Sequence, residues 1–568
     1  MSPAPPRTFN FADIWEFAAD AVPDREALVC GPRRLTFAQF ESRANRLANH
    51  LLAAGVEPGD FIGLFCSNAT EYLETMCAAY KVRAVPININ HRYSTTELGE
   101  LLDDSGAVAL VYEASLAPQV AALGAERLGR LRTLLAVGDP ASGDPVEDPG
   151  VPRAVAFDEA IAAQPDDRPA VAGRSGDDLY VLYTGGTTGR PKGVVWRQED
   201  ALYPCFGAGD PTRINPVSTP EELADRIGDF AVTYYCIPPL MHAAGQWVAI
   251  SWLWNGGRVI LHPGSFEPER IWDTVDAEGV NLLTVVGDAV GKPLLEAWLA
   301  HPGRWQADSL FSISNGGAPM SPSLKARLAG AFPSKAITDG FGSSETGAQG
   351  AQRLEPDSAD GGAGDGTAGD GAADERATGV AKFRPANELT AVLGDDLEPV
   401  VPGLGGIGRV ALRGRVPLRY HNDPAKSAAT FVEHGGHRWV ITGDMATVDA
   451  DGAINLLGRG SQCINTGGEK VFSEEVELTL QGHPAVADVL VVGVPDERWG
   501  QAVCAVVQPA AGAAPSLDDL REHARRALAG YKLPKHLVLV ERVQRSPAGK
   551  ADYRWAAAVA ADAEVNAG

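Results

Sequence analysis

A glycine- and threonine-rich segment with one lysine is the part of the chain best suited to bind phosphate. It runs Tyr183-Thr-Gly-Gly-Thr-Thr-Gly-Arg-Pro-Lys-Gly-Val194 and follows an apolar run, Leu179 to Tyr183, that predicts a strand. Glycines let the backbone turn so that N–H groups converge on an anion, and threonine hydroxyls add donors. Lys192 supplies a point charge for the outer phosphates of a nucleotide. The predicted binding residues are Thr184, Gly185, Gly186, Thr187, Thr188, Gly189 and Lys192.

This segment differs from the P-loop of the GTPases and common ATPases. That motif requires Gly-x4-Gly-Lys-Ser/Thr, whereas here Pro191 separates Arg190 from Lys192. The sequence therefore predicts nucleotide binding without a kinase-like or GTPase-like reaction.

Several further short motifs follow along the chain. They are Ser314 to Pro319, Phe341-Gly-Ser-Ser-Glu-Thr-Gly347, Thr442-Gly-Asp444, Gly458 to Ser461, Ile464 to Glu477 and Arg545 to Lys550. Taken alone, each would be an ordinary turn, a solvated loop carboxylate or an exposed lysine. Their occurrence in this order along one chain is what makes them informative.

The ordered set resembles the core motifs of the adenylate-forming superfamily, which includes acyl-CoA synthetases, firefly-type luciferases and peptide-synthetase adenylation domains. The resemblance implies ATP and Mg2+ as ligands, and a hard carboxylate suits Mg2+. It implies that the Phe341 ring packs on adenine, that Glu345 and Thr184 hold the metal, and that Asp444 accepts hydrogen bonds from the ribose. The other nucleotide-binding residues that it implies are Gly317, Ala318, Pro319, Gly342, Ser343, Ser344 and Arg459.

The same resemblance implies two domains. Residues 1–459 would form an N-terminal AMP-binding and acyl-binding domain, and residues 460–568 a small, mobile C-terminal lid with its hinge at Ser461. Relatives often carry Asp or Lys at this pivot, but a small polar residue can absorb a large backbone change. In the lid, the resemblance implies that Lys550 bridges the acyl carboxylate and the α-phosphate.

Coenzyme A is the second cosubstrate that the resemblance implies. In the family, the lid rotates and presents another face to the pantetheine tunnel. Gly467, Gly468, Lys532 and Lys535 match positions that line or flank that site, although both lysines could equally be ordinary exposed charges. Ser473 is expected to be the N-cap of the helix after Gly468, where the helix dipole favours the glutamates that follow.

The implied chemistry activates a carboxylic acid in two steps. The carboxylate attacks the α-phosphate of ATP, pyrophosphate leaves, and the AMP ester becomes the acyl donor for the CoA thiol. The protein must bring two anions together and neutralise developing charge, as in phosphoryl transfer generally. Lys192, Glu345 and Lys550 are the catalytic candidates, and no protein nucleophile is required.

The acid-binding region is less well defined by the sequence. Pro238 to Gly245 resembles the family segment in which a histidine or an aromatic residue gates the acid site, so His242 is a further catalytic candidate. The run from Gln246 to Leu261, with Trp247, Trp252 and Trp254, could line a hydrophobic cavity or belong to the core. The motifs are most similar to those of actinobacterial acyl-CoA synthetases for sterol side chains and related bulky acids, which favours a medium- or long-chain, branched or steroid side-chain substrate.

Three alternatives remain at this stage. Fatty acyl-AMP ligases, which deliver acyl groups to carrier proteins, carry a folded insertion after the aromatic-Gly-x-x-Glu motif, where this chain has a Gly- and Asp-rich stretch at 356–379. That stretch has too few apolar residues to dock, so a flexible loop is expected. A peptide-synthetase adenylation module is less expected, because 18 residues follow Lys550 and no carrier domain is appended. A non-catalytic sensor would be expected to have lost at least one of Lys192, Glu345, Asp444 and Lys550, and all four are present.

Composition excludes other classes of function. The chain has 568 residues and a formal net charge of -24, which disfavours nucleic-acid binding and leaves ATP and CoA to local loops and lysines. Its seven cysteines are scattered without a C-x-x-C pair, which favours a reducing, cytoplasmic location. No signal peptide and no apolar run of about 20 residues is visible. The sequence leaves the oligomeric state open, and a homodimer is compatible with it.

The alternation of elements predicts an α/β fold with a large N-terminal adenylate-forming domain and a small α+β C-terminal domain. Phe11 to Ala19 and Thr36 to Ala54 have the pattern of amphipathic helices, the second opening with a capping box at Thr36 and Gln39. Short apolar runs at 61–66, 108–112 and 131–137 alternate with helical stretches, which is typical of α/β units.

Overall fold

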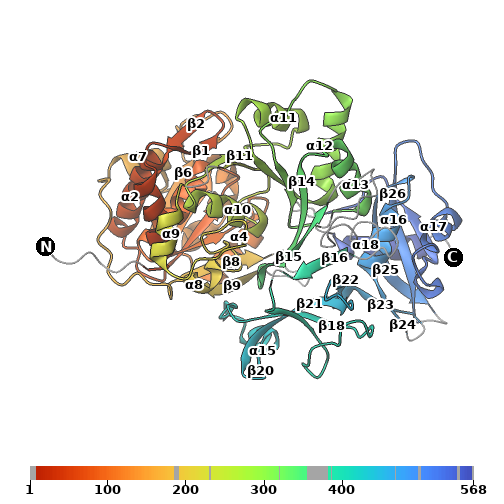
Figure 1. The fold of residues 1–568 in the computed structure, drawn as a ribbon. Helices are drawn as coiled ribbons and strands as arrows, with labels where there is room; N and C mark the ends of the chain where they lie inside the picture. Colours follow the sequence, from red (N-terminus) through yellow and green to blue (C-terminus); the bar gives the residue numbers. More distant parts are fainter. Residues whose placement is uncertain are drawn as a thin grey trace.

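The computed structural model describes residues 8–184, 191–228, 232–318, 320–354, 381–385, 387–466, 469–496, 500–545 and 551–565. The Gly- and Asp-rich stretch at 356–379 lies outside these residues. Within them the predicted fold class is confirmed: a large N-terminal domain of α/β layers precedes a small C-terminal domain (Figure 1). None of the described helices has the length and apolar character needed to span a membrane.

A five-stranded parallel sheet forms the first α/β layer, in the order β4-β3-β5-β6-β7. Its strands are β3 (Phe61–Phe65), β4 (Val85–Asn88), β5 (Ala109–Glu113), β6 (Thr133–Val137) and β7 (Val155–Ala156). Every residue of β3, β4 and β6 is buried, as expected for a parallel sheet with both faces covered. The three predicted strands are confirmed, with boundaries that differ by one or two residues.

The two predicted amphipathic helices are also confirmed. They are α1 (Phe11–Ala21) and α2 (Phe37–Ala53). The Thr36 side chain accepts from the amide of Gln39, and the Gln39 side chain accepts from the amide of Thr36, so the capping box forms as its sequence indicates.

The largest sheet of the described chain has fourteen strands and carries the site. Its order is β17-β18-β21-β22-β16-β15-β14-β13-β12-β10-β11-β1-β2, with β20 paired to β21. The segment β1-β11-β10-β12-β13-β14 is parallel, so the carboxyl ends of these strands share one edge, where ligands bind in open α/β sheets. The strands are β1 (Glu26–Cys30), β2 (Arg33–Thr36), β10 (Thr233–Cys236), β11 (Arg258–Leu261), β12 (Leu282–Val285), β13 (Ser312–Asn315), β14 (Ala336–Ser343), β15 (Gly347–Leu354), β16 (Ala381–Pro385), β17 (Thr390–Leu393), β18 (Gly408–Arg413), β20 (Phe431–His434), β21 (His437–Val448) and β22 (Ile454–Arg459).

A small antiparallel sheet, β19-β9-β8, presents the phosphate-loop candidate. Its strands are β8 (Leu179–Thr184), β9 (Lys192–Arg197) and β19 (Arg419–Tyr420). The remaining helices of the large domain are α3 (Thr70–Lys81), α4 (Thr95–Ser105), α5 (Ala117–Ala121), α6 (Gly124–Arg130), α7 (Phe157–Ala162), α8 (Gln198–Leu202), α9 (Pro220–Arg226), α10 (Ala243–Trp254), α11 (Pro268–Ala277), α12 (Gly287–Ala300), α13 (Pro322–Ala331) and α15 (Pro424–Thr430), with a 3-10 turn at Ala114–Leu116.

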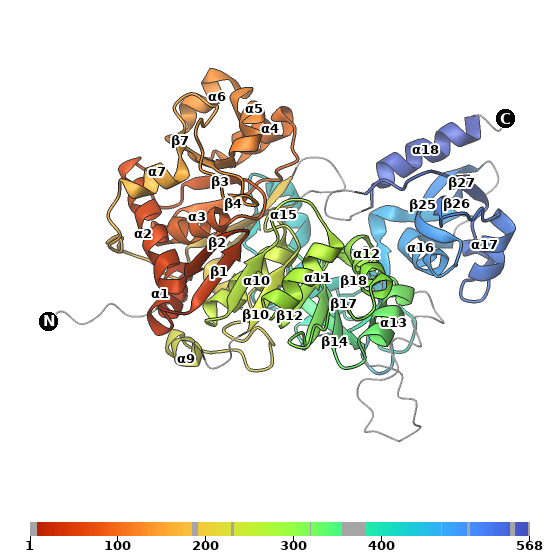
Figure 2. The ribbon, with the colours of Figure 1, turned by 90° about the horizontal axis from the view of Figure 1, so that it is seen from above.

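The small domain has its own five-stranded sheet, β24-β23-β26-β25 with β27 paired to β26. Its elements are β23 (Cys463–Thr466), β24 (Glu469–Phe472), β25 (Val486–Asp496), β26 (Gly500–Pro509), β27 (His536–Leu539), α16 (Ser473–Gln481), α17 (Leu517–Ala524) and α18 (Tyr553–Val565), with 3-10 turns at Gly460–Gln462 and Gly530–Lys532. In both views the domain lies at the C-terminal end of the molecule, opposite the N-terminus (Figures 1 and 2). Lys292 on α12 reaches across to it and donates from Nζ to the carbonyl of Ala487 at 3.2 Å.

One local prediction in this domain is wrong. Ser473 is the first residue of α16 and not its N-cap, a position that Phe472 takes. The hydroxyl of Ser473 instead donates to the carbonyl of Gln462 at 3.0 Å, so a tertiary acceptor replaces the local capping bond.

Candidate active site

One cavity of about 2560 Å³ brings most of the described candidate residues together. It is lined by Thr184, Lys192, His242, Gly317, Phe341, Gly342, Ser343, Ser344, Glu345 and Asp444. Ala318, Lys532 and Lys535 are described but are not among its lining residues. Gly185, Gly186, Thr187, Thr188, Gly189, Pro319, Gly467, Gly468 and Lys550 lie outside the described residues, and Arg459 is described by its backbone alone.

Thr184 and Lys192 flank the glycine-rich loop and are cross-strand partners. β8 and β9 pair antiparallel, and their register sets Thr184 opposite Lys192. The ammonium of Lys192 lies 3.6 Å from Oδ2 of Asp423 and 5.7 Å from the centre of the Tyr420 ring. These contacts hold the lysine head at the wall of the cavity.

The aromatic-Gly-x-x-Glu motif forms the hairpin between β14 and β15. The amide of Thr346 donates to the carbonyl of Ser343 at 3.2 Å, which closes a tight turn with Ser344 and Glu345 at its tip. Gly347 has a φ of +69°, and a side chain there would collide with the backbone of Pro204. The turn therefore requires glycine at this position.

Two residues outside the predicted set hold this hairpin in place. The hydroxyl of Tyr420 donates to Oε1 of Glu345 at 2.9 Å, and the indole of Trp196 donates to the carbonyl of Ser344 at 3.1 Å. Tyr420 belongs to the two-residue strand β19 and lies 75 positions from Glu345 in the sequence. No local pattern could have paired these two residues. On the other side of the hairpin, the Phe341 ring stacks on Phe383, with centroids 4.4 Å apart.

An asparagine shapes the small-residue loop at the end of β13. Oδ1 of Asn315 accepts from the amide of Gly287 at 2.7 Å, and its Nδ2 donates to the carbonyl of Ala318 at 2.9 Å and to Asp339 at 2.7 Å. Asp339 also pairs with the buried ammonium of Lys325 at 2.8 Å. This network fixes the backbone that leads into Gly316 and Gly317, both of which line the cavity.

Asp444 lies on the far wall, where β21 and β22 pair. Its register partner is Arg459, and its amide donates to the hydroxyl of Thr442 at 3.2 Å. Thr442, Gly443 and Asp444 all line the cavity. Asp444, predicted to contact the ribose, and Lys192, predicted to contact the phosphates, therefore lie on strands that are distant in sequence and border one cavity.

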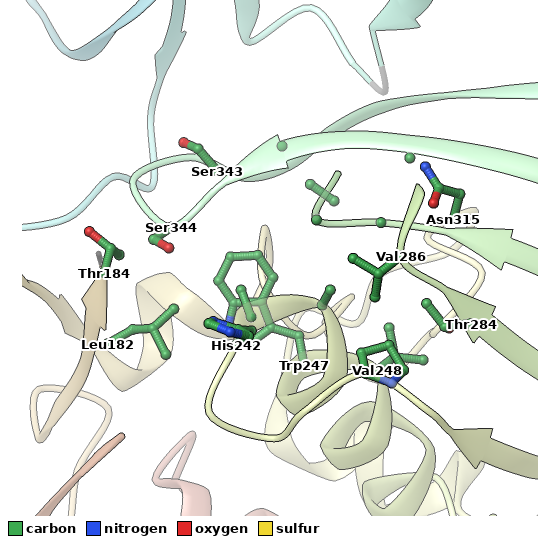
Figure 3. A pocket seen from close by; sticks show the side chains of 18 of the residues that line it. Leu182, Thr184, His242, Trp247, Val248, Thr284, Val286, Asn315, Ser343 and Ser344 are labelled. Atoms are coloured by element: carbon green, nitrogen blue, oxygen red, sulfur yellow. The ribbon is translucent and has the colours of Figure 1, made fainter. Parts of the chain in front are cut away.

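The predicted acid-binding wall consists largely of α10 and the facing strands (Figure 3). His242 is the N-cap residue of α10, and Trp247 and Val248 follow on the helix. Thr284 on β12 and Val286, directly after that strand, line the same cavity. Trp252 also lines the cavity, whereas Trp254 is a core residue that packs against Phe11 and Phe206. Trp247 and Trp252 therefore line the cavity, and Trp254 belongs to the core.

The small domain borders one side of the cavity with one residue near the domain boundary and five that follow Lys550. Gln462, Ala551, Asp552, Tyr553, Arg554 and Ala557 are all lining residues. Lys532 lies elsewhere in this domain, where its ammonium donates to Oε1 of Glu475 at 2.5 Å. This lysine is therefore ion-paired in the structure.

The cavity is locally cationic in an acidic protein. Among the described lining residues, the cations are Arg92, Lys192, Arg213, Arg353, Arg384, Arg409, Lys426 and Arg554, and the anions are Glu97, Glu100, Glu345, Asp444 and Asp552. Such a surplus attracts a polyanion such as ATP despite the net charge of -24. Burial and a 2.7 Å bond to Asp104 raise the pKa of Tyr183, so its phenol lines the site in the neutral form.

Comparison with known proteins decides the family. A family model described as AMP-binding enzyme matches residues 15–417, and a second, described as AMP-binding enzyme C-terminal domain, matches residues 475–550. The chain belongs to the AMP-binding enzyme family. This AMP-binding enzyme is 42% identical over 552 residues to a 3-oxocholest-4-en-26-oate--CoA ligase of Rhodococcus rhodochrous, covering 96% of this chain and 95% of the relative.

Other relatives have similar names. A medium/long-chain-fatty-acid--CoA/3-oxocholest-4-en-26-oate--CoA ligase of Mycobacterium tuberculosis is 43% identical over 548 residues, with 96% of this chain and 95% of the relative covered. Among solved structures, the anthranilate CoA ligase AuaEII in complex with anthranoyl-AMP matches with a TM-score of 0.78 at 23% identity, covering 98% of this chain and 99% of that one. The structural match shows that the two chains share a fold.

Proposed function

We propose that this AMP-binding enzyme is an ATP-dependent acyl-CoA synthetase for bulky or long carboxylic acids. The observation that carries the proposal is a single cavity that joins the nucleotide set, Lys192, Glu345 and Asp444, to the apolar wall of α10. The names of the relatives support CoA as acceptor and medium- or long-chain fatty acids or steroid side-chain acids as substrates. A cytoplasmic location accords with this activity.

In the proposed first step, a carboxylate oxygen of the acid attacks the α-phosphorus of ATP. The bond from that phosphorus to the bridging oxygen breaks, and pyrophosphate carries away the electron pair. Lys192 would neutralise the outer phosphates, and Lys550, next in sequence to the lining residue Ala551, would bridge the two reacting anions. Asp444 would accept hydrogen bonds from the ribose, and Phe341 would pack on adenine.

Magnesium fits the residues at the phosphate end. The carboxylate of Glu345 and the hydroxyl of Thr184 are hard oxygen donors that line the same cavity, and Tyr420 orients the carboxylate. When bound there, Mg2+ would supply positive charge to the phosphate oxygens.

In the proposed second step, the thiol of coenzyme A loses its proton and attacks the acyl carbonyl, and AMP leaves. His242, at the amino end of α10, would contact the acyl carboxylate region and move between the two steps. Gly467, Gly468, Lys532 and Lys535 would serve CoA, and Lys532 would then have to exchange its bond to Glu475. We place the boundary of the lid at residue 460, with Ser461 as its pivot.

The decisive experiment measures pyrophosphate release with ATP, Mg2+ and a panel of acids from acetate through palmitate to 3-oxocholest-4-en-26-oate, with and without CoA. We expect acid-dependent pyrophosphate release and a CoA thioester as product. Glu345→Gln should reduce release by about two orders of magnitude, the scale on which removal of one group that stabilises developing charge acts. An adenylate that accumulates whether or not CoA is present would instead indicate a carrier-protein ligase. No pyrophosphate release with any acid of the panel would indicate a non-catalytic binder.

A further inference from the structure

The described residues on either side of positions 546–550 are held together. Residues 546–550 are bounded by Arg545 and Ala551, and these two residues form an antiparallel β-bridge. The amide of Asp552 also donates to the carbonyl of Gln544 at 3.3 Å. Ala551 also lines the cavity, so this bridge lies at the edge of the candidate site.

Arg545 is tied to the sheet of the small domain by a two-pronged ion pair. Its Nε donates to Oδ2 of Asp488 at 2.7 Å, and its Nη2 donates to Oδ1 at 2.6 Å. The exposed fractions of the two side chains are 22% and 23%. A bidentate and largely buried pair fixes both distance and orientation, unlike a solvated surface pair.

The other end of the segment is tied through Tyr553, the first residue of α18. Its hydroxyl donates to Oε2 of Glu477 at 3.1 Å. Oε1 of Glu477 in turn accepts from the amide of Val491 at 2.7 Å, and the side chain is buried within the domain. Val491 and Asp488 both belong to β25, so one strand anchors both ends.

We propose that Asp488 and Glu477 are positioning residues for acyl-adenylate formation, which hold Arg545 and Tyr553 and thereby fix both ends of the Lys550 segment against the cavity. The inference rests on the proposed function, since it assigns Lys550 to the first step. Loss of one partner leaves the other buried and poorly paired, and that end of the segment is released. The first step suffers because it must join two anions. The second step starts from an adenylate already formed and needs no such bridge.

The test compares the two half-reactions in Asp488→Ala and Tyr553→Phe with those of the wild type. We expect the single-turnover rate of adenylate formation to fall about tenfold in each variant, the loss that corresponds to one hydrogen bond or ion pair. The KM for ATP and the rate of thioester formation from supplied acyl-AMP should stay within about twofold of the wild type, a change too small to represent a lost interaction. Asp519→Ala is the matched control, because the Asp519 carboxylate accepts from the amide of Ser516 in the capping box of α17, in the same domain.

A second readout does not depend on activity. In Asp488→Ala, amide hydrogen exchange should accelerate in peptides that span residues 542–553 and remain unchanged in β25 and α17. Unchanged exchange in those peptides, or equal losses in both half-reactions, would overturn the proposal. If the wild type forms no adenylate with any acid, the proposed function fails, and the exchange measurement alone decides whether Asp488 holds the segment.

Discussion

The hydroxyl of Tyr420 donates a 2.9 Å hydrogen bond to Oε1 of Glu345, across the cavity edge between β19 and the β14–β15 hairpin. The same ring lies beneath the ammonium of Lys192, 5.7 Å from its centre. One aromatic side chain therefore touches both the carboxylate assigned to Mg2+ and the lysine assigned to the outer phosphates.

Tyr420→Phe should keep the ring and remove the orienting bond. We expect acid-dependent pyrophosphate release to fall about three- to tenfold, and the Mg2+ concentration for half-maximal rate to rise by a similar factor, as loss of one hydrogen bond predicts. A Mg2+ titration of the rate checks this. Tyr112→Phe is the control, because its hydroxyl bonds to the carbonyl of Pro149 away from the cavity. Equal effects in both variants would contradict an orienting role for Tyr420.

Val248→Trp should shorten the acyl arm of the cavity. Val248 is half-buried on α10 and lines the cavity together with Thr284 and Val286 (Figure 3). Filling this space should lower kcat/KM for palmitate and steroid side-chain acids by about tenfold or more, while short acids lose little, since a pocket discriminates by 1–3 kcal/mol per group. Steady-state kinetics over the acid panel measure the change. Val248→Ala should retain the long acids, and uniform losses over all acids in Val248→Trp would argue against this wall.

Gly458→Ala should disfavour the orientation in which the small domain borders the cavity. Gly458 has a φ of +113°, and an added Cβ would overlap the carboxylate of Glu474 on α16. We expect adenylate formation to fall by about tenfold relative to thioester formation from acyl-AMP, since relieving an overlap of this kind costs roughly 1–3 kcal/mol. Single-turnover kinetics of both steps check this.

The control for that change is Gly452→Ala. Gly452 also has a positive φ, of +83°, but an added Cβ would meet no atom within 4 Å. It therefore carries the backbone strain without the overlap. If both variants shift the two half-reactions alike, contact between Gly458 and Glu474 does not set the orientation.

Glu477 should make the stability of the small domain depend on pH. Burial and the nearby Glu474 raise the pKa of Glu477 from 4.5 to about 8. Between these two pKa values the folded state keeps a proton on Glu477 that the unfolded state releases. The stabilisation of the folded domain by protonated Glu477 is therefore fully present below about pH 4.5 and is lost as the pH rises towards 8. The slope is on the order of 1 kcal/mol per pH unit within that window.

Glu477→Gln preserves the shape and cannot ionise. Its Tm relative to the wild type should therefore rise steadily between pH 5 and pH 8, as followed by thermal unfolding at matched ionic strength. A Tm difference that stays constant over this range would show that the carboxyl group does not retain its proton in the folded domain.

Sequence patterns predicted correctly those elements that depend on residues close together in the chain. The capping box at Thr36 formed because both partners lie within one helical turn. The N-cap predicted at Ser473 failed because its hydroxyl found the Gln462 carbonyl, which lies 11 residues away. Trp247 and Trp254 are similar in sequence context, yet one lines the cavity and the other packs in the core. Both lie on nearly the same face of α10, two turns apart, so their position along the helix axis and not the local sequence decides which one meets the cavity.

The sequence by itself determined the α/β fold, the family and the ordered motifs with Lys192, Glu345, Asp444 and Lys550, because turn chemistry, periodicity and motif order are properties of neighbouring residues. Only the tertiary structure decided which residues support them: Tyr420 beneath Glu345, Asp488 beside Arg545, and Glu477 beside Tyr553. These partners lie between 57 and 76 positions apart. Pairing over such distances depends on how strands align and on which polar groups burial leaves in need of a partner.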